Sequence, residues 1–170
     1  FKSAEVFERA KAIDTVVFDK TGTLTRGAMT LTTIETDEPA DRFLTLVGSV
    51  EAASEHTIGM AVALGAEERD LTLHPVEDFV AHRGLGVEGT VDGVRVAVGR
   101  TLLMNELGLD VPERDDAAMG RIERQGHTAI LVAWDGHVRG AIGVAGAASE
   151  QDEACALAGI RSIGRRGGDD

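Results

Sequence analysis

The stretch TVVFDKTGTLT at residues 15–25 decides the fold, because an apolar run ends there in a polar turn. Residues 15–18 (TVVF) are continuously apolar, which is typical of a strand buried on both faces of a parallel sheet. The run stops at Asp19, and a turn that contains Gly22 follows it. Because α/β folds place their chemistry at the carboxyl ends of such strands, we expect an α/β protein with a functional carboxylate at Asp19.

The residue types of DKTGTLT (residues 19–25) suit phosphoryl transfer. A carboxylate such as that of Asp19 can attack a phosphoryl group and become an aspartyl phosphate. The backbone N–H groups and hydroxyls of the turn would hold the phosphoryl oxygens, and Mg²⁺ would offset their charge. A bare Asp-x-Thr is more often an ordinary surface turn, whereas all seven residues in order favour the phosphoryl-transfer interpretation.

DKTGTLT resembles the phosphorylation motif of P-type ATPases, which belong to the haloacid-dehalogenase-like superfamily. The resemblance implies that Asp19 accepts the γ-phosphate of ATP, that Asp19, Lys20 and Thr21 form the catalytic group, and that Asp19 and Thr21 belong to an incomplete Mg²⁺ site. Related phosphatases have a second Asp where this chain has Thr21, and a threonine cannot activate water in that role. A long-lived phosphoenzyme, as a pump requires, is therefore expected.

A second motif, EAASEHTI at residues 51–58, is similar to the Ser-Glu-His-Pro motif of the heavy-metal-transporting subgroup of P-type ATPases. This similarity implies that His56 lies near the adenine of ATP and that Glu51, five residues earlier, belongs to the same site. The chain departs from the motif at Thr57, where proline is usual. Taken alone, a histidine before a helix is more often structural or exposed.

Glycines and one arginine complete the nucleotide-binding set implied by the resemblance. Gly84-Leu85-Gly86 resembles the Gly-x-Gly of the same nucleotide-binding domain, and glycines let a base or a phosphate lie close to the backbone. Taken alone, this pattern is equally typical of a strand bend or bulge, and it is not a Rossmann fingerprint. Arg100 falls where the family has Gly-Asn or Gly-Arg, and it is either a phosphate contact or a solvated cation.

The middle of the chain predicts antiparallel strands and helices. Two Asp-Gly pairs, Asp92-Gly93 and Asp135-Gly136, stand between strand-like runs, and such pairs favour two-residue hairpin turns. A Thr-rich strand is expected over residues 27–36. Apolar spacing predicts helices over residues 39–54, 58–68, 102–107 and 116–125.

We therefore expect an α/β fold class in which an α+β nucleotide-binding domain, with an antiparallel sheet and flanking helices, is inserted in a partial haloacid-dehalogenase-like phosphorylation domain. The expected bounds are residues 1–32 and 144–170 for the phosphorylation parts and 33–143 for the nucleotide-binding domain. Because the chain begins with Phe1, we also expect it to be a piece of a longer protein.

The composition of the chain limits the kinds of partner and site that it can have. Lys and Arg number 17 against 29 Asp and Glu, and a net charge of −12 disfavours nucleic acid. The single Cys155 allows no intramolecular disulfide and too few thiolates for a Cys-based metal site. No apolar run reaches the roughly 18 residues of a membrane helix. The five histidines show no metal-binding spacing.

The function expected from these observations is ATP binding by the cytoplasmic fragment of a P-type ATPase. The parent pump would lie in the plasma membrane and export a heavy-metal cation. The partners are ATP, Mg²⁺ and the rest of the pump, and the fragment itself is expected to be soluble and monomeric, with weak ATP binding and no sustained turnover. Two alternatives are a soluble haloacid-dehalogenase-like phosphatase, disfavoured by Thr21, and a non-catalytic metal-binding module, disfavoured by the single Cys and dispersed His.

Overall fold

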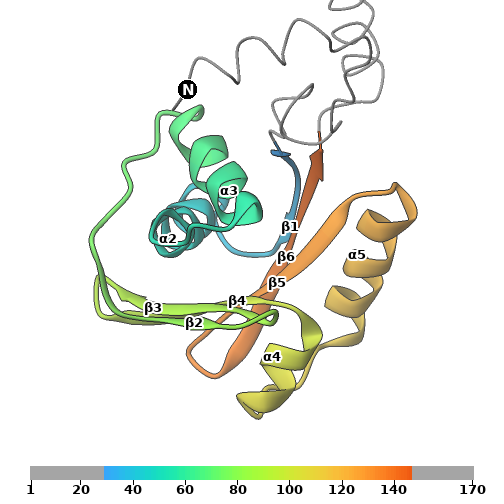
Figure 1. Cartoon of the computed structure of the whole chain (residues 1–170). Helices are drawn as coiled ribbons and strands as arrows, with labels where there is room; N and C mark the ends of the chain where they lie inside the picture. The colour runs from blue at the N-terminus through green and yellow to red at the C-terminus, as the bar shows by residue number, and fades with distance from the viewer. Residues whose placement is uncertain (1–28, 147–170) are drawn as a thin grey trace, which may run out of the picture. The chain divides into compact units, whose positions relative to one another are not determined.

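The computed structural model describes residues 29–146, in which six antiparallel strands form one sheet (Figure 1). The strands lie in the order β1-β6-β5-β4-β3-β2. Their bounds are β1 Met29–Thr36, β2 Val76–His82, β3 Gly86–Val91, β4 Val94–Gly99, β5 Thr128–Trp134 and β6 His137–Gly146. The expected strand at residues 15–18, the residues Asp19, Lys20 and Thr21, and the segment after residue 146 lie outside the described residues.

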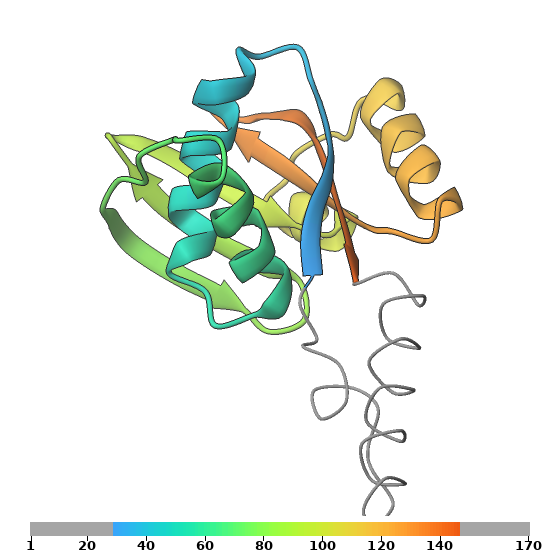
Figure 2. The same cartoon turned by 90° about the horizontal axis from the view of Figure 1, so that it is seen from above.

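Helices cover both faces of the sheet (Figure 2). Helices α2 (Ala40–Ala52) and α3 (Thr57–Glu67) pack on one face, and α4 (Thr101–Glu106) and α5 (Glu113–Arg124) pack on the other. The expected α/β class, with an antiparallel sheet flanked by helices, is confirmed. No helix between residues 29 and 146 is both long enough and apolar enough to cross a bilayer.

Strand β5 shows why a central strand reads as an unbroken apolar run. Side chains alternate between faces along a strand. In β5, Ile130, Val132 and Trp134 join the core under α2 and α3, whereas Ala129, Leu131 and Ala133 join the core under α4 and α5. Because helices cover both faces of the sheet here, neither face of β5 is exposed to water. The sequence TAILVAW therefore shows no alternation of polar and apolar residues.

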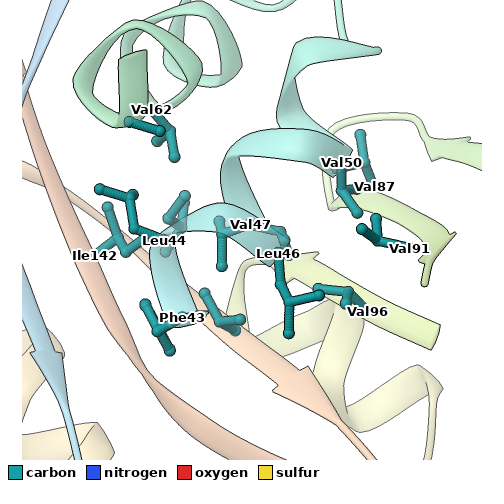
Figure 3. Packing of buried hydrophobic residues seen from close by; sticks show 14 of the residues in the cluster. Phe43, Leu44, Leu46, Val47, Val50, Val62, Val87, Val91, Val96 and Ile142 are labelled. Carbon is teal, nitrogen blue, oxygen red and sulfur yellow. The ribbon is translucent and has the colours of Figure 1, made fainter. Parts of the chain in front are cut away.

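Helix α2 carries the main core (Figure 3). The expected stripe of Phe43, Leu46, Val47 and Val50 is buried, as predicted from the helical spacing. The ring of Phe43 also packs against the indole of Trp134, with centroids 5.6 Å apart. Since Trp134 is the only tryptophan of the chain, its fluorescence reports on this core.

Both expected hairpins are present. Asp92 and Gly93 have φ angles of 50° and 77°, and Asp135 and Gly136 have 51° and 74°. Positive φ at both central residues is the requirement of a type I′ turn, and this explains why Asp-Gly predicts the β3–β4 and β5–β6 connections.

The structure corrects two expectations and extends the sheet. The last expected helix starts at Glu113 rather than residue 116, because Pro112 opens it and acidic residues fill its first turn. Strand β2 was not expected at all. The sheet also runs from Met29 to Gly146, a few residues beyond the expected bounds of 33 and 143 at both ends.

Candidate functional site

A pocket of about 340 Å³ lies between the α2–α3 corner and the turn that joins β2 to β3. Its volume falls in the range of roughly 300–1,000 Å³ that small-molecule sites occupy. The five described residues of the expected nucleotide set all line it, namely Glu51, His56, Gly84, Gly86 and Arg100. The fold therefore brings together residues that the sequence keeps up to about fifty positions apart.

His56 forms the N-cap of α3. Its Nδ1 accepts a hydrogen bond from the backbone N–H of Ile58 at 3.2 Å, and its own backbone N–H donates to Ser54 Oγ at 3.2 Å. Because Nδ1 acts as an acceptor, the neutral ring carries its proton on Nε2. In the exposed imidazole, Nδ1 therefore caps α3, and among residues 29–146 the Nε2–H donor has no hydrogen-bond partner.

Glu51 is an acid buried in the last turn of α2. It is 5% exposed, and its side chain lies against Gly59 of α3, where any Cβ would collide with it. Glu51 lines the pocket, and among residues 29–146 burial is the only cause that shifts its titration. Burial raises the pKa of Glu51 from 4.5 to about 7, so near neutral pH this carboxyl group can both donate and accept a hydrogen bond.

The two glycines of the Gly-x-Gly turn have different tasks. Gly84 has a φ of 76°, and a Cβ there would meet no atom within 4 Å. Gly86 has a φ of 151° and pairs with Gly99 of β4, and its Cβ would lie 2.6 Å from the Gly99 Cα and 2.8 Å from Leu103 Cδ2. Gly84 therefore leaves open space beside the pocket, whereas Gly86 allows the close approach of β3, β4 and α4.

Arg100 is fixed to the same turn through its backbone. Its N–H donates to the carbonyl oxygen of Leu85 at 2.8 Å, and its side chain is exposed at the pocket. Sequence reasoning did not single out Arg83, which also lines the pocket. Its position directly before Gly84 was the signal that could have identified it.

The other four described histidines each contact a different partner, and of these four His82 also lines the pocket. His74 Nδ1 lies 2.5 Å from Asp92 Oδ2, His82 Nε2 lies 2.6 Å from Glu88 Oε1, and His127 Nδ1 lies 3.1 Å from Thr32 Oγ1. His137 Nδ1 lies 2.8 Å from the backbone oxygen of Asp135. Between residues 29 and 146, no group of three His, Cys, Asp or Glu side chains is arranged to hold a metal ion.

The Thr57→Pro variant is expected to fold and to gain about 0.5–1 kcal/mol of unfolding free energy. Thr57 is the first residue of α3, the position at which proline is most readily accepted in a helix. The preceding His56 has φ −78° and ψ 140°, which is the conformation that a following proline requires. Thermal unfolding of both proteins measures the difference, and a lower midpoint for the proline variant would contradict the expectation.

Comparison with known proteins gives three consistent findings. The family model for haloacid dehalogenase-like hydrolases matches residues 13–161. The probable copper-exporting P-type ATPase V of Mycobacterium tuberculosis is 44% identical over 146 residues, which cover 85% of this chain and 19% of that protein. The chain spans about a fifth of the length of the curated relatives it matches.

Solved structures of a PIB-type ATPase and of a CPx-ATPase align with this chain. A zinc-transporting PIB-type ATPase aligns with a TM-score of 0.64 and 28% identity, over 76% of this chain and 21% of that chain. The catalytic domain of the CPx-ATPase CopB-B, solved to describe conformational changes upon nucleotide binding, aligns with a TM-score of 0.51 and 28% identity. That alignment covers 85% of this chain and 47% of the other.

Proposed function

This chain belongs to the haloacid dehalogenase-like hydrolase family, and from that premise we propose that it is the ATP-binding and phosphorylated segment of a heavy-metal P-type ATPase. The observation that carries the proposal is the pocket lined by Glu51, His56, the Gly84–Gly86 turn and Arg100. Three separate stretches of the chain contribute these groups, and each stretch contains a motif or position that the family resemblance implies.

The described side chains suit the recognition of an adenine nucleotide. The Nε2–H of His56 is a donor, and the ring offers a face on which a base can stack. The carboxyl group of Glu51, with its pKa near 7, can donate to a ring nitrogen or accept from an exocyclic amine. The space beside Gly84 admits part of the ligand close to the backbone.

Asp19 is the proposed acceptor in the phosphoryl transfer from ATP. A carboxylate oxygen of Asp19 attacks the γ-phosphorus of ATP, the bond from that phosphorus to the β–γ bridging oxygen breaks, and ADP leaves. Asp19 and Thr21 supply oxygen donors of the kind that Mg²⁺ prefers, and the ion, when bound, would offset the phosphate charge. Because position 21 is threonine and not a second aspartate, its side chain cannot activate water against the acyl phosphate, and slow hydrolysis is expected.

The proposal includes the arrangement of the parent protein. Residues 33–143, with the ends of β1 and β6 that continue the same sheet, form the nucleotide-binding domain, and the rest of residues 1–32 and 144–170 are parts of the phosphorylation domain. The parent lies in the plasma membrane with this segment on the cytoplasmic side, and phosphorylation drives export of a heavy-metal cation. Solved structures named for copper and for zinc transport share this fold, and we therefore propose that these residues do not select the metal.

Titration of the 170-residue chain with ATP tests the proposal. In amide NMR spectra, shifts are expected to cluster at Glu51, His56, Gly84 and Gly86. The His56→Asn variant is expected to weaken ATP binding about tenfold, because one base-stacking contact is worth roughly 1–3 kcal/mol. Asparagine is a good N-cap, so this variant removes the imidazole while α3 keeps its cap.

A folded chain whose amide signals do not move at saturating ATP would contradict the proposal. The same holds if His56→Asn binds ATP as tightly as the original chain. His56→Ala serves as the comparison variant, because it removes both the imidazole and the cap. We expect its ATP affinity to match that of His56→Asn while its unfolding free energy falls by about 1 kcal/mol.

A further inference from the structure

Two arginines on one wall of the pocket have no role in adenine recognition. Arg83 is the first residue after β2, directly before Gly84, and Arg100 follows the last residue of β4. Both side chains are exposed, and both residues line the pocket. We propose that Arg83, together with Arg100, holds the phosphate chain of the bound nucleotide, an inference that rests on the proposed ATP-binding function.

The two arginines are cations in a chain that is strongly acidic overall. The whole chain has a net charge of −12, and no lysine occurs between residues 29 and 146. Arginine is therefore the only permanently cationic side chain of the described part. A polyanion approaching this acidic surface is repelled over most of it and attracted where unneutralised guanidinium groups stand together.

Most other arginines of the described part are neutralised by acids. Arg95 Nε lies 3.1 Å from Glu88 Oε2, Arg121 Nη2 lies 2.8 Å from Glu35 Oε2, and Arg139 Nη1 lies 3.2 Å from Glu38 Oε1. Within residues 29–146, Arg83 and Arg100 make no such ion pair. Their planar guanidinium groups remain available for the bidentate contacts that arginine makes with phosphate.

The backbone holds the two arginines to the same short turn. Arg100 N–H donates to the carbonyl oxygen of Leu85 at 2.8 Å, and Gly99 pairs with Gly86. Arg83 lies two residues from Leu85 along the chain. The backbone of both residues is therefore tied to the same turn, and both residues line the pocket.

The remaining charges orient the ligand. Glu51 and Glu55 line the pocket from the α2–α3 corner, whereas both arginines come from the wall made by the β2–β3 turn and the end of β4. The exposed acidic side chain of Glu55 repels phosphates from the first wall, and the two guanidinium groups attract them to the second. The base therefore lies toward Glu51 and His56, and the phosphate chain lies along Arg83 and Arg100.

The test compares adenosine ligands that differ in phosphate number with inorganic tripolyphosphate, which is the phosphate chain alone. Calorimetric titrations of the 170-residue chain use ATP, ADP, AMP, adenosine and inorganic tripolyphosphate. Arg83→Gln is expected to weaken ATP and tripolyphosphate binding about fivefold, the effect of one exposed charge contact, and to leave adenosine unchanged. Arg83→Lys is expected to retain most of the ATP affinity, and Arg83→Gln with Arg100→Gln to lose about 25-fold if the contacts are independent.

Arg124→Gln is the matched control, because it makes the same charge change on α5, outside the pocket. It is expected to bind every ligand as the original chain does, and Trp134 fluorescence during thermal unfolding checks that each variant is folded. The inference is overturned if Arg83→Gln leaves ATP binding unchanged or weakens adenosine equally. If the original chain binds neither ATP nor adenosine, the proposed function fails instead.

Discussion

Replacing Gly86 with alanine is expected to lower the unfolding free energy by about 4 kcal/mol. The backbone at Gly86 has a φ of 151°, which side-chain-bearing residues rarely adopt, and such strain costs of order 1–3 kcal/mol. The new methyl group would also press on the Gly99 backbone and on Leu103, and overpacking adds about 1–3 kcal/mol. Urea denaturation followed by Trp134 fluorescence measures the loss.

Gly84→Ala is the matched control in the same turn. Its φ of 76° is also strained for alanine, but a Cβ there meets nothing within 4 Å. Only the strain of roughly 1–2 kcal/mol is expected. Equal losses for the two variants would show that backbone strain alone explains both glycines, and that the close packing of β3, β4 and α4 around Gly86 contributes nothing.

The sequence predicted the elements whose cause is local. A type I′ turn needs two residues that accept positive φ, so Asp92-Gly93 and Asp135-Gly136 located both hairpins. The stripe of α2 was equally readable, because a helix that packs against a sheet repeats its apolar residues at helical spacing. Neither inference needs knowledge of the partner element.

Strand β2 (Val76–His82) was missed because its cause is not local. It lies at the edge of the sheet, and its sequence VEDFVAH shows no clear alternation. The register shifts between Glu77 and Val80, and Asp78 has a φ of 50°, so an irregularity breaks the two-residue period. This strand is held in the sheet by its pairing with β3, and the sequence of β2 by itself does not show that pairing.

Only those pocket residues that belong to recognisable motifs could be predicted from the sequence. Motif resemblance selected His56, but the N-cap hydrogen bond to Ile58 appears only when the start of α3 is known. For Arg83 the only sequence signal was its place directly before Gly84, and whether its charge is neutralised depends on which acids of residues 29–146 lie near it. The burial of Glu51 depends on α3 folding over the end of α2, and a sequence alone does not show this.

Glu51→Gln is expected to stabilise the protein in a manner that depends on pH. Burial raises the pKa of Glu51 in the folded chain from 4.5 to about 7. Between these values the folded state holds a proton that the unfolded state has released. The contribution of Glu51 to stability is therefore fully present below pH 4.5 and is lost as the pH rises through 7. Linkage gives a loss of about 2.5 kcal/mol between pH 5 and pH 8.

Glutamine stays neutral, so the difference in unfolding free energy between Glu51→Gln and the original chain should grow by that amount from about pH 5 to about pH 8. Urea denaturation at both pH values measures it. Glu55→Gln is the matched control, because Glu55 lines the same pocket but is exposed. A difference that stays constant with pH for Glu51→Gln would show that the Glu51 carboxyl group is not held in its neutral form. If the variant is more stable at the higher pH yet binds ATP more weakly, the buried acid is retained for binding at the expense of stability, as the proposed function requires.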